Sequence, residues 1–184
     1  MKEFRIHGRG GQGAVMGSKI AGLAASLQGG YALALPFYGF ERRGAPVTVF
    51  LRFDQKPINL NSRVYNPDGI VVLDSKFLQA PEMVVFGLKE GGLAIFNTKK
   101  SPDQIHLSVK LSKIATIDAM EVALQTIGKP ITNTAILGAF CKVTGLLELD
   151  SLYKALERYL PAANLDKNIE AANLAYHQVN VMEL

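Results

Sequence analysis

The sequence predicts an α/β protein, namely a three-layer sandwich with a largely parallel sheet, a glycine loop after the first strand and a helical C-terminal part. Three observations support this prediction. Strand-like and helix-like segments alternate along most of the chain, and helices follow them. A glycine-rich loop, residues 7–13, separates the first strand from the first helix. Residues 69–74 form an apolar run that ends in an aspartate, which is typical of a strand buried on both faces of a parallel sheet.

Segments rich in β-branched and aromatic residues are predicted as strands. Val47–Phe53 is one of the clearest, because turn-forming residues follow it at 54–57. In chain order, the predicted strands are Glu3–His7, Tyr31–Leu35, Val47–Phe53, Gly69–Asp74, Leu93–Asn97 and Ile114–Asp118.

The segments between and after these strands are predicted as helices. The first has almost no polar face, so we expect it to be covered on several sides. The helix near residue 155 has one apolar stripe containing Leu152 and Leu156, so we expect it to dock by one face. The predicted helices are Ala14–Leu27, Ser75 to about Leu88, Met120–Ile127, Thr132–Val143, Ser151–Tyr159 and Leu165–Val179. No repeat or linker divides the chain, so residues 1–184 are expected to form a single domain.

The composition excludes several functional classes. With 48% hydrophobic and 20% charged residues, the chain has the composition of a soluble globular protein. Its net charge is only +4, and it has no basic run with interleaved aromatics, so nucleic acid is not an expected partner. No apolar stretch approaches the roughly 20 residues that span a bilayer. The first residues are strand-like and lack a secretory apolar region, so a cytoplasmic location without membrane attachment is expected.

Cysteine usage limits the redox chemistry of the chain. The sequence has one cysteine, Cys141, in an apolar helical segment. One thiol can neither close an internal disulfide nor supply the four thiolates of a usual iron–sulfur cluster. We therefore expect Cys141 to be a small buried hydrophobic residue, and any electron transfer to use metal centres held by other chains.

The glycine loop matches the pattern G-x-G-x-x-G at Gly8, Gly10 and Gly13, a Rossmann-like arrangement between a strand and a helix. A nicotinamide site also needs an acidic residue at the end of the second strand, and Tyr31–Leu35 has none. Three interpretations stay open: a dinucleotide site, an anion site at the helix start, and a tight crossover packed against a neighbouring subunit. The candidate ligand-contacting residues here are Gly8, Arg9, Gly10, Gly11, Gln12 and Gly13.

The second unusual segment is Leu35–Pro46, which contains aromatics, two glycines, two prolines and the adjacent charges Glu41, Arg42 and Arg43. This composition predicts a shaped loop that presents an arginine pair. Arginine forks bind phosphates and carboxylates in a directed way, so the pair is a candidate anchor for an anionic ligand. Alternatively, one arginine pairs with Glu41 or with an acid on a partner chain.

At these segments the chain resembles a known family. Arg5–Gly13 and Phe37–Pro46 are similar to two motifs of the gamma subunits of pyruvate and related 2-oxoacid:ferredoxin oxidoreductases. Pro67–Asp74 and Pro130–Ala139 also match, and together the four matches cover nearly the whole chain. The resemblance adds Asn133 and Thr134 to the candidate cofactor-binding residues.

The resemblance implies a complex that oxidatively decarboxylates a 2-oxoacid, with pyruvate the first candidate, to acyl-coenzyme A and CO2 while it reduces ferredoxin. In that family, thiamine diphosphate and Mg2+ lie between the alpha and beta subunits, and 4Fe–4S clusters lie on partner subunits such as delta. The gamma subunit completes the heterotetramer near the active site and is a candidate contributor to coenzyme A binding. It would carry no catalytic residue, metal or cofactor of its own and would be inactive alone.

Two alternatives remain at the sequence level. One is a free-standing nucleotide-binding protein or NAD(P)-dependent enzyme, and the other is a structural clamp without ligand contact.

His7, beside the glycine loop, is interpreted as hydrogen-bonded scaffold, while His106 and His177 are expected to face solvent. Asp74 and Asp118 end apolar strands at the sheet edge of the glycine loop, and Asp74 is expected to cap a helix.

Overall fold

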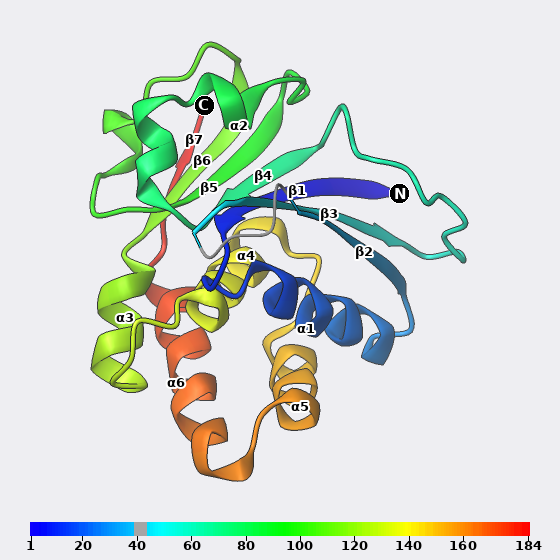
Figure 1. Ribbon diagram of the computed structural model, residues 1–184, viewed down its shortest axis with the longest axis vertical. Helices are drawn as coiled ribbons and strands as arrows, with labels where there is room; N and C mark the ends of the chain where they lie inside the picture. Colours follow the sequence, from blue (N-terminus) through cyan, green and yellow to red (C-terminus); the bar gives the residue numbers. More distant parts are fainter. Residues whose placement is uncertain (39–43) are drawn as a thin grey trace.

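The computed structural model describes residues 1–38 and 44–184. In this part of the chain, seven strands form one sheet in the order β2-β3-β1-β4-β5-β6-β7 (Figure 1). The four central strands β1, β4, β5 and β6 are parallel, while β2, β3 and β7 run antiparallel to their neighbours. The bounds are β1 Lys2–Arg9, β2 Tyr31–Tyr38, β3 Pro46–Asp54, β4 Gly69–Val72, β5 Gly92–Asn97, β6 Leu111–Ile117 and β7 Asn180–Glu183. The predicted α/β sandwich is confirmed, with a sheet that is parallel at its centre.

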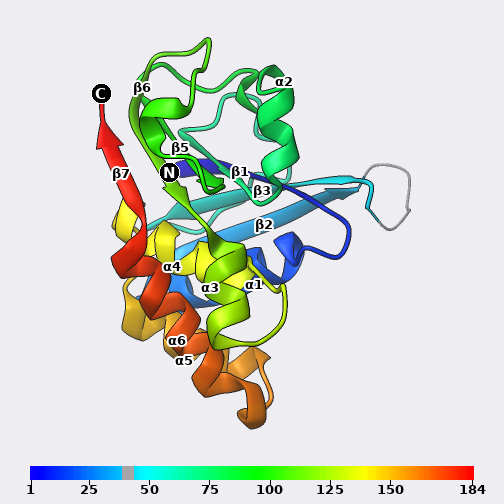
Figure 2. The same cartoon turned by 90° about the vertical axis from the view of Figure 1, so that its left-hand side faces the viewer.

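Helices cover the two faces of the sheet unequally (Figures 1 and 2). On one face, α1 packs on β2 and β3, α4 packs on β5 and β6, and α5 and α6 form an outer layer on α1 and α4. Among the described residues, the helical elements on the other face are α2 and two 3-10 turns. The bounds are α1 Ala14–Leu27, η1 Ser75–Gln79, α2 Glu82–Val85, η2 Pro102–Gln104, α3 Ala119–Thr126, α4 Asn133–Thr144, α5 Leu149–Tyr159 and α6 Ala162–Gln178.

Strand β4 separates two hydrophobic cores. Val71 points into the larger core on the side of α1 and α4, while Ile70 and Val72 point into the smaller core beneath η1 and α2. All four residues of β4 are buried. The prediction that this apolar run is a strand buried on both faces is therefore confirmed.

The second motif begins inside a strand, which corrects the prediction of a loop from Leu35 onward. Strand β2 continues to Tyr38, and Pro36 pairs with Val49 of β3. Proline has no N–H to donate and is tolerated in a sheet mainly on edge strands. Because β2 is the edge of this sheet, Pro36 does not interrupt it.

Two other predictions were wrong in detail. The predicted helix from Ser75 to Leu88 is split into η1 and α2, because Pro81 begins a new helical turn and cannot continue the previous one. The last predicted helix ends one residue early, at Gln178, and is followed by β7, which pairs with β6. Strand β7 was missed because four mostly exposed residues carry no clear periodic pattern.

Two predictions about helix burial hold. In α5, Leu152 and Leu156 are fully buried, so this helix docks by one face as expected. Helix α1 packs against the sheet, α4 and α5, although Met16 and Leu27 on its open side are more than 40% exposed. None of the helices in residues 1–38 and 44–184 combines the length and apolarity needed to cross a membrane.

Candidate functional site

The glycine loop turns sharply from the end of β1 into α1. Gly11 and Gly13 have positive φ angles of 96° and 79°, a conformation that other residues rarely adopt. Gly13 is also the N-cap of α1. A Cβ atom added to Gly13 would lie only 2.9 Å from Nδ2 of Asn133. Glycine is therefore required here for both the turn and the close approach of α4.

Asp74 organises the glycine loop from the end of the neighbouring strand β4. Its carboxylate accepts hydrogen bonds from Arg9 Nε at 2.8 Å and from Gln12 Nε2 at 3.1 Å. It also accepts from the backbone N–H of Lys76 at 2.9 Å, which confirms the predicted helix cap. Gln12 Oε1 in turn accepts from the backbone N–H of Arg9 at 2.8 Å. The loop is thus a closed network with limited freedom to rearrange.

The described end of the second motif pairs with the glycine loop. The N–H of Gly10 donates to Ala45 O at 2.9 Å, and the N–H of Gly44 donates to Gly10 O at 3.3 Å. Arg9 Nη1 donates to Gly44 O at 3.2 Å. The candidates Glu41, Arg42 and Arg43 lie outside the described residues. Two motifs that the sequence analysis treated separately are therefore parts of one site.

The two candidates at the start of α4 have different surroundings. Asn133 contacts Gly13 and Gly17 of the loop and α1. Thr134 is 1% exposed, and its hydroxyl donates to Asn168 Oδ1 of α6 at 2.8 Å. The structure therefore brings Asn133 to the glycine loop, whereas Thr134 contributes to the contact between α4 and α6.

Asn97 is a further residue of this sheet edge that the sequence analysis did not single out. Its Nδ2 donates to Leu73 O at 2.9 Å, and its Oδ1 accepts from the N–H of Ala119 at 3.0 Å. It therefore ties the end of β4 to the start of α3. The sequence signal that could have identified Asn97 is its position as a polar residue directly after the apolar residues of β5. Asp118, at the same edge, caps α3 by accepting from the N–H of Glu121.

His7 is buried beside the glycine loop, with 7% of its surface exposed. Its Nε2 atom has no hydrogen-bond partner among the described residues, so the interpretation as hydrogen-bonded scaffold is wrong for this nitrogen. Burial and then the positive charge of Arg5 lower the pKa of His7 from 6.5 to about 3. The imidazole is therefore neutral in the folded protein near pH 7.

This shift predicts a loss of stability in mild acid. The unfolded chain takes up a proton on His7 as the pH falls below about 6.5, whereas the folded chain does so only near pH 3. The contribution is therefore complete above about pH 6.5 and declines as the pH falls, by about 2 kcal/mol between pH 7 and pH 5. Urea unfolding of the parent and of His7→Leu at both pH values measures it. Equal losses in the two proteins would refute this assignment to His7.

The remaining histidines and the cysteine match their predictions. Cys141 is 2% exposed, and burial raises the pKa of its thiol to about 12, so it behaves as a buried hydrophobic residue. His106 and His177 are exposed, as expected. Within residues 1–38 and 44–184, no three His, Cys, Asp or Glu side chains are grouped to hold a metal ion.

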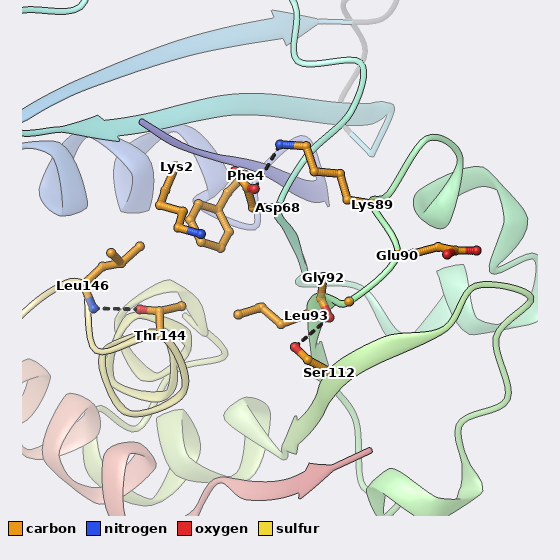
Figure 3. Close-up of a pocket in the computed structure, with 11 residues that line it drawn as sticks. Lys2, Phe4, Asp68, Lys89, Glu90, Gly92, Leu93, Ser112, Thr144 and Leu146 are labelled. Carbon is orange, nitrogen blue, oxygen red and sulfur yellow. Dashed lines mark hydrogen bonds and ion pairs between the residues drawn. The ribbon is translucent and has the colours of Figure 1, made fainter.

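A separate cavity of about 240 Å³ lies at the opposite edge of the sheet (Figure 3). Its lining includes an ion pair between Lys89 Nζ and Asp68 Oδ1 at 2.9 Å. Partial burial raises the pKa of Asp68, but hydrogen bonds from the N–H of Glu3 and from Lys89 outweigh this and lower it. Ligands of open α/β sheets bind at the carboxyl ends of the strands, and this cavity is at the amino ends. The glycine loop is therefore the better candidate site.

The loop geometry disfavours a dinucleotide site. Strand β2 is separated from β1 by β3, whereas a dinucleotide site needs the acidic end of a neighbouring parallel strand. The N–H groups of Arg9, Gly10 and Gln12 already donate to other acceptors within the protein. A packed crossover fits this geometry, and an anion site would have to use the N–H groups at the start of α1 instead.

Residues 3–178 match the protein family described as pyruvate ferredoxin/flavodoxin oxidoreductase. The chain is 48% identical over 186 residues to the pyruvate/ketoisovalerate oxidoreductases common subunit gamma of Thermococcus kodakarensis, and the match covers 100% of both chains. It is 36% identical to the crystal structure of pyruvate oxidoreductase subunit PORC of Thermotoga maritima, with a TM-score of 0.87, covering 99% of this chain and 98% of that chain.

A more distant likeness concerns the fold alone. The 2-oxoglutarate:ferredoxin oxidoreductase of Magnetococcus marinus, solved with 2-oxoglutarate, coenzyme A and succinyl-CoA bound, is 17% identical with a TM-score of 0.75. The match covers 96% of this chain but only 30% of that chain. The same fold therefore also occurs as one part of a much longer polypeptide.

Proposed function

The chain belongs to the pyruvate ferredoxin/flavodoxin oxidoreductase family, and from this premise we propose that it serves as the gamma subunit of a multi-subunit 2-oxoacid:ferredoxin oxidoreductase. The observation that carries the proposal is the end-to-end 48% identity with a subunit of that name. A free-standing NAD(P)-dependent enzyme is not favoured by these relatives. The proposed reaction is oxidative decarboxylation of a 2-oxoacid, with pyruvate as the first candidate.

In this proposal the chemistry belongs to partner chains. Alpha and beta subunits would hold thiamine diphosphate and Mg2+, a delta subunit would carry 4Fe–4S clusters, and ferredoxin would accept the electrons. The present chain would complete the assembly and would be inactive by itself. The burial of Cys141, the single cysteine of the chain, and the raised pKa of its thiol support a structural contribution of this residue and not a redox one.

The glycine-loop site is proposed to contribute to coenzyme A binding. Contacts among the described residues connect the glycine loop to three other segments at the carboxyl edge of the sheet: Gly10 pairs with Gly44 and Ala45, Arg9 binds Asp74, and Gly13 meets Asn133. The second motif also contains Glu41, Arg42 and Arg43, which the sequence makes candidate ligand contacts. An arginine pair suits the phosphates of coenzyme A, which carry several negative charges.

Co-production of the chain with alpha, beta and delta subunits of the same source tests the main proposal. We expect a stable complex that reduces ferredoxin with pyruvate and coenzyme A, whereas the isolated chain should show no activity. If the isolated chain oxidised pyruvate, or if no larger chains purified with it, the proposal would be wrong. Calorimetric titration of the isolated chain with NADH should show no micromolar binding.

The coenzyme A proposal predicts a kinetic effect in the assembled enzyme. Loss of one charge-assisted contact costs about 1.5 kcal/mol, so Arg42→Ala and Arg43→Ala should each raise KM for coenzyme A about tenfold. The KM for pyruvate should stay unchanged. Arg158→Ala, at an exposed end of α5, is the matched control. An unchanged KM for coenzyme A in both variants would favour the structural clamp.

A further inference from the structure

Two buried arginines lie on the face of the sheet that α1 and α4 do not cover. Arg5 and Arg52 are 8% and 1% exposed. In the pairing of β1 with β3, Glu3 is opposite Arg52 and Arg5 is opposite Phe50. Directly paired residues share a face of the sheet, as do alternate residues of a strand. Both side chains therefore lie on this face. The backbone segments that cross the same face are residues 59–66 and α2 (Figure 1).

Each guanidinium group holds the backbone of one of these segments. Arg5 Nη2 donates to the carbonyls of Val84, at 3.0 Å, and Phe86 at the end of α2. Among the described residues Arg5 Nε has no acceptor, and burial lowers the pKa of Arg5. Burying a cation without a carboxylate costs free energy, so the hydrogen bonds that Arg5 donates to the end of α2 must offset this cost.

Arg52 holds the other segment. Its Nη1 donates to Leu60 O at 3.1 Å and to Ser62 O at 2.8 Å, while its Nε pairs with Glu3 Oε1 at 2.8 Å. The backbone next to the two anchored segments is also joined, because Asn66 Nδ2 donates to Gly87 O at 3.2 Å. The two segments therefore form one rigid surface.

This surface displays large apolar side chains to solvent. Tyr65, Met83 and Phe86 are 66%, 64% and 76% exposed, and we call these three residues the Tyr65–Phe86 patch. The two backbone segments meet here, since a Cβ atom on Gly87, the residue after Phe86, would lie 2.3 Å from Tyr65 O. Rigid, exposed aromatics in a cluster are typical of protein–protein contacts, because little conformational entropy remains to be lost on binding.

A positive charge lies next to the patch. The exposed Arg63, two residues before Tyr65, stacks on the ring of Phe37 with 3.8 Å between Cζ and the ring centroid. Its backbone carbonyl is a further acceptor of Arg52, so the position of this residue is also anchored. An apolar centre with an arginine beside it is a common composition of interface hot spots.

We propose that the Tyr65–Phe86 patch docks a larger subunit of the same oxidoreductase, at an apolar pocket of that subunit with an acidic side chain at its rim to meet Arg63. This inference rests on the proposed function and adds to it the surface and the partner chemistry. A dissimilar partner is favoured over a second copy because the same fold occurs as 30% of a longer chain, where it is covalently joined to a larger remainder.

The test measures the affinity of the purified chain for the rest of the complex. Phe86→Arg and Tyr65→Arg should each weaken binding by at least about 30-fold, which is typical of a hot-spot residue. Arg63→Glu should slow association and reverse its dependence on salt. Leu27→Arg, a 44% exposed leucine at the end of α1, is the matched control and should leave the affinity unchanged. Thermal unfolding checks that all variants are folded.

The possible outcomes separate this inference from the proposed function. If the parent chain assembles and Phe86→Arg and Tyr65→Arg assemble equally well, the docking surface is wrong and the gamma-subunit proposal stands. If the parent chain fails to assemble with the larger subunits, both proposals fall. If light scattering shows that the isolated chain is a dimer that Phe86→Arg dissociates while assembly persists, the patch binds a second copy and the inference is overturned.

Discussion

Replacing Gly138 with alanine is expected to lower the free energy of unfolding by about 3 kcal/mol, and the melting temperature by about 6–12 °C. Gly138 lies in α4 where that helix crosses α6. A Cβ atom there would be 2.0 Å from the carbonyl oxygen of Ala172, and 2.8 Å from its Cα. The obstacle is backbone, so no side-chain rotation relieves the clash and the helices must separate. The residues packed around this contact, such as Ala139 of α4 and Ala171 of α6, are buried in the larger core, which makes separation costly.

The same substitution in α1 is the matched control for Gly138→Ala. Gly22 is a helix-interior glycine whose added Cβ would meet only Ala32 Cβ at 3.8 Å, an ordinary contact. Since alanine favours the helix, Gly22→Ala should be neutral or stabilise the protein by about 0.5–1 kcal/mol. Chemical denaturation of both variants measures the difference. If Gly138→Ala were as stable as Gly22→Ala, the close packing of α4 on α6 would be incorrect.

Arg52→Ala is expected to have an effect of similar size, about 3 kcal/mol or more, because it removes one partner of a nearly buried charge network. The change leaves the carboxylate of Glu3 unpaired and deprives the carbonyls of Leu60 and Ser62 of their donor. The segment from 59 to 66 should then detach from the sheet. Denaturant unfolding measures the stability, and limited proteolysis should show faster cleavage within this segment.

Two controls separate the contribution of the several hydrogen bonds of the Arg52 guanidinium group from the contribution of its charge alone. Arg52→Lys keeps the charge but cannot reach several carbonyls at once, so it should recover only part of the lost stability. Arg158→Ala at an exposed position of α5 should change stability by less than about 0.5 kcal/mol. Unchanged proteolysis of residues 59–66 in Arg52→Ala would contradict the anchoring role.

The sequence predicted the local elements well where a strong pattern was present. The run at 69–74 and the apolar helix at 14–27 are long or uniform enough for periodicity to identify them, and both are present. The failures occur where local pattern is weak or misleading. Pro36 suggested the end of a strand, although an edge strand tolerates proline. Strand β7 is only four residues long and mostly exposed.

The candidate site was predicted in its parts and not in its assembly. The glycine loop and the second motif were recognised as unusual, and Asn133 was added by the family resemblance. That Gly10 pairs with Gly44 and Ala45 depends on the antiparallel partnership of β1 with β3, which no local pattern encodes. Conversely, residues that are adjacent in the sequence need not share a site. Thr134 follows Asn133 directly but faces α6 and not the glycine loop.

By itself, the sequence determined the class of fold, the glycine turn and the family likeness, because these depend on residue type and short-range order along the chain. The tertiary structure decided which strands are neighbours, and hence that Arg9 meets Asp74 across 65 positions and that Arg5 holds the end of α2 across about 80. Such contacts are set by the pairing of strands and by which face of the sheet each side chain takes. A shift of one residue in that pairing would reverse every face, so they are established only when the whole sheet forms.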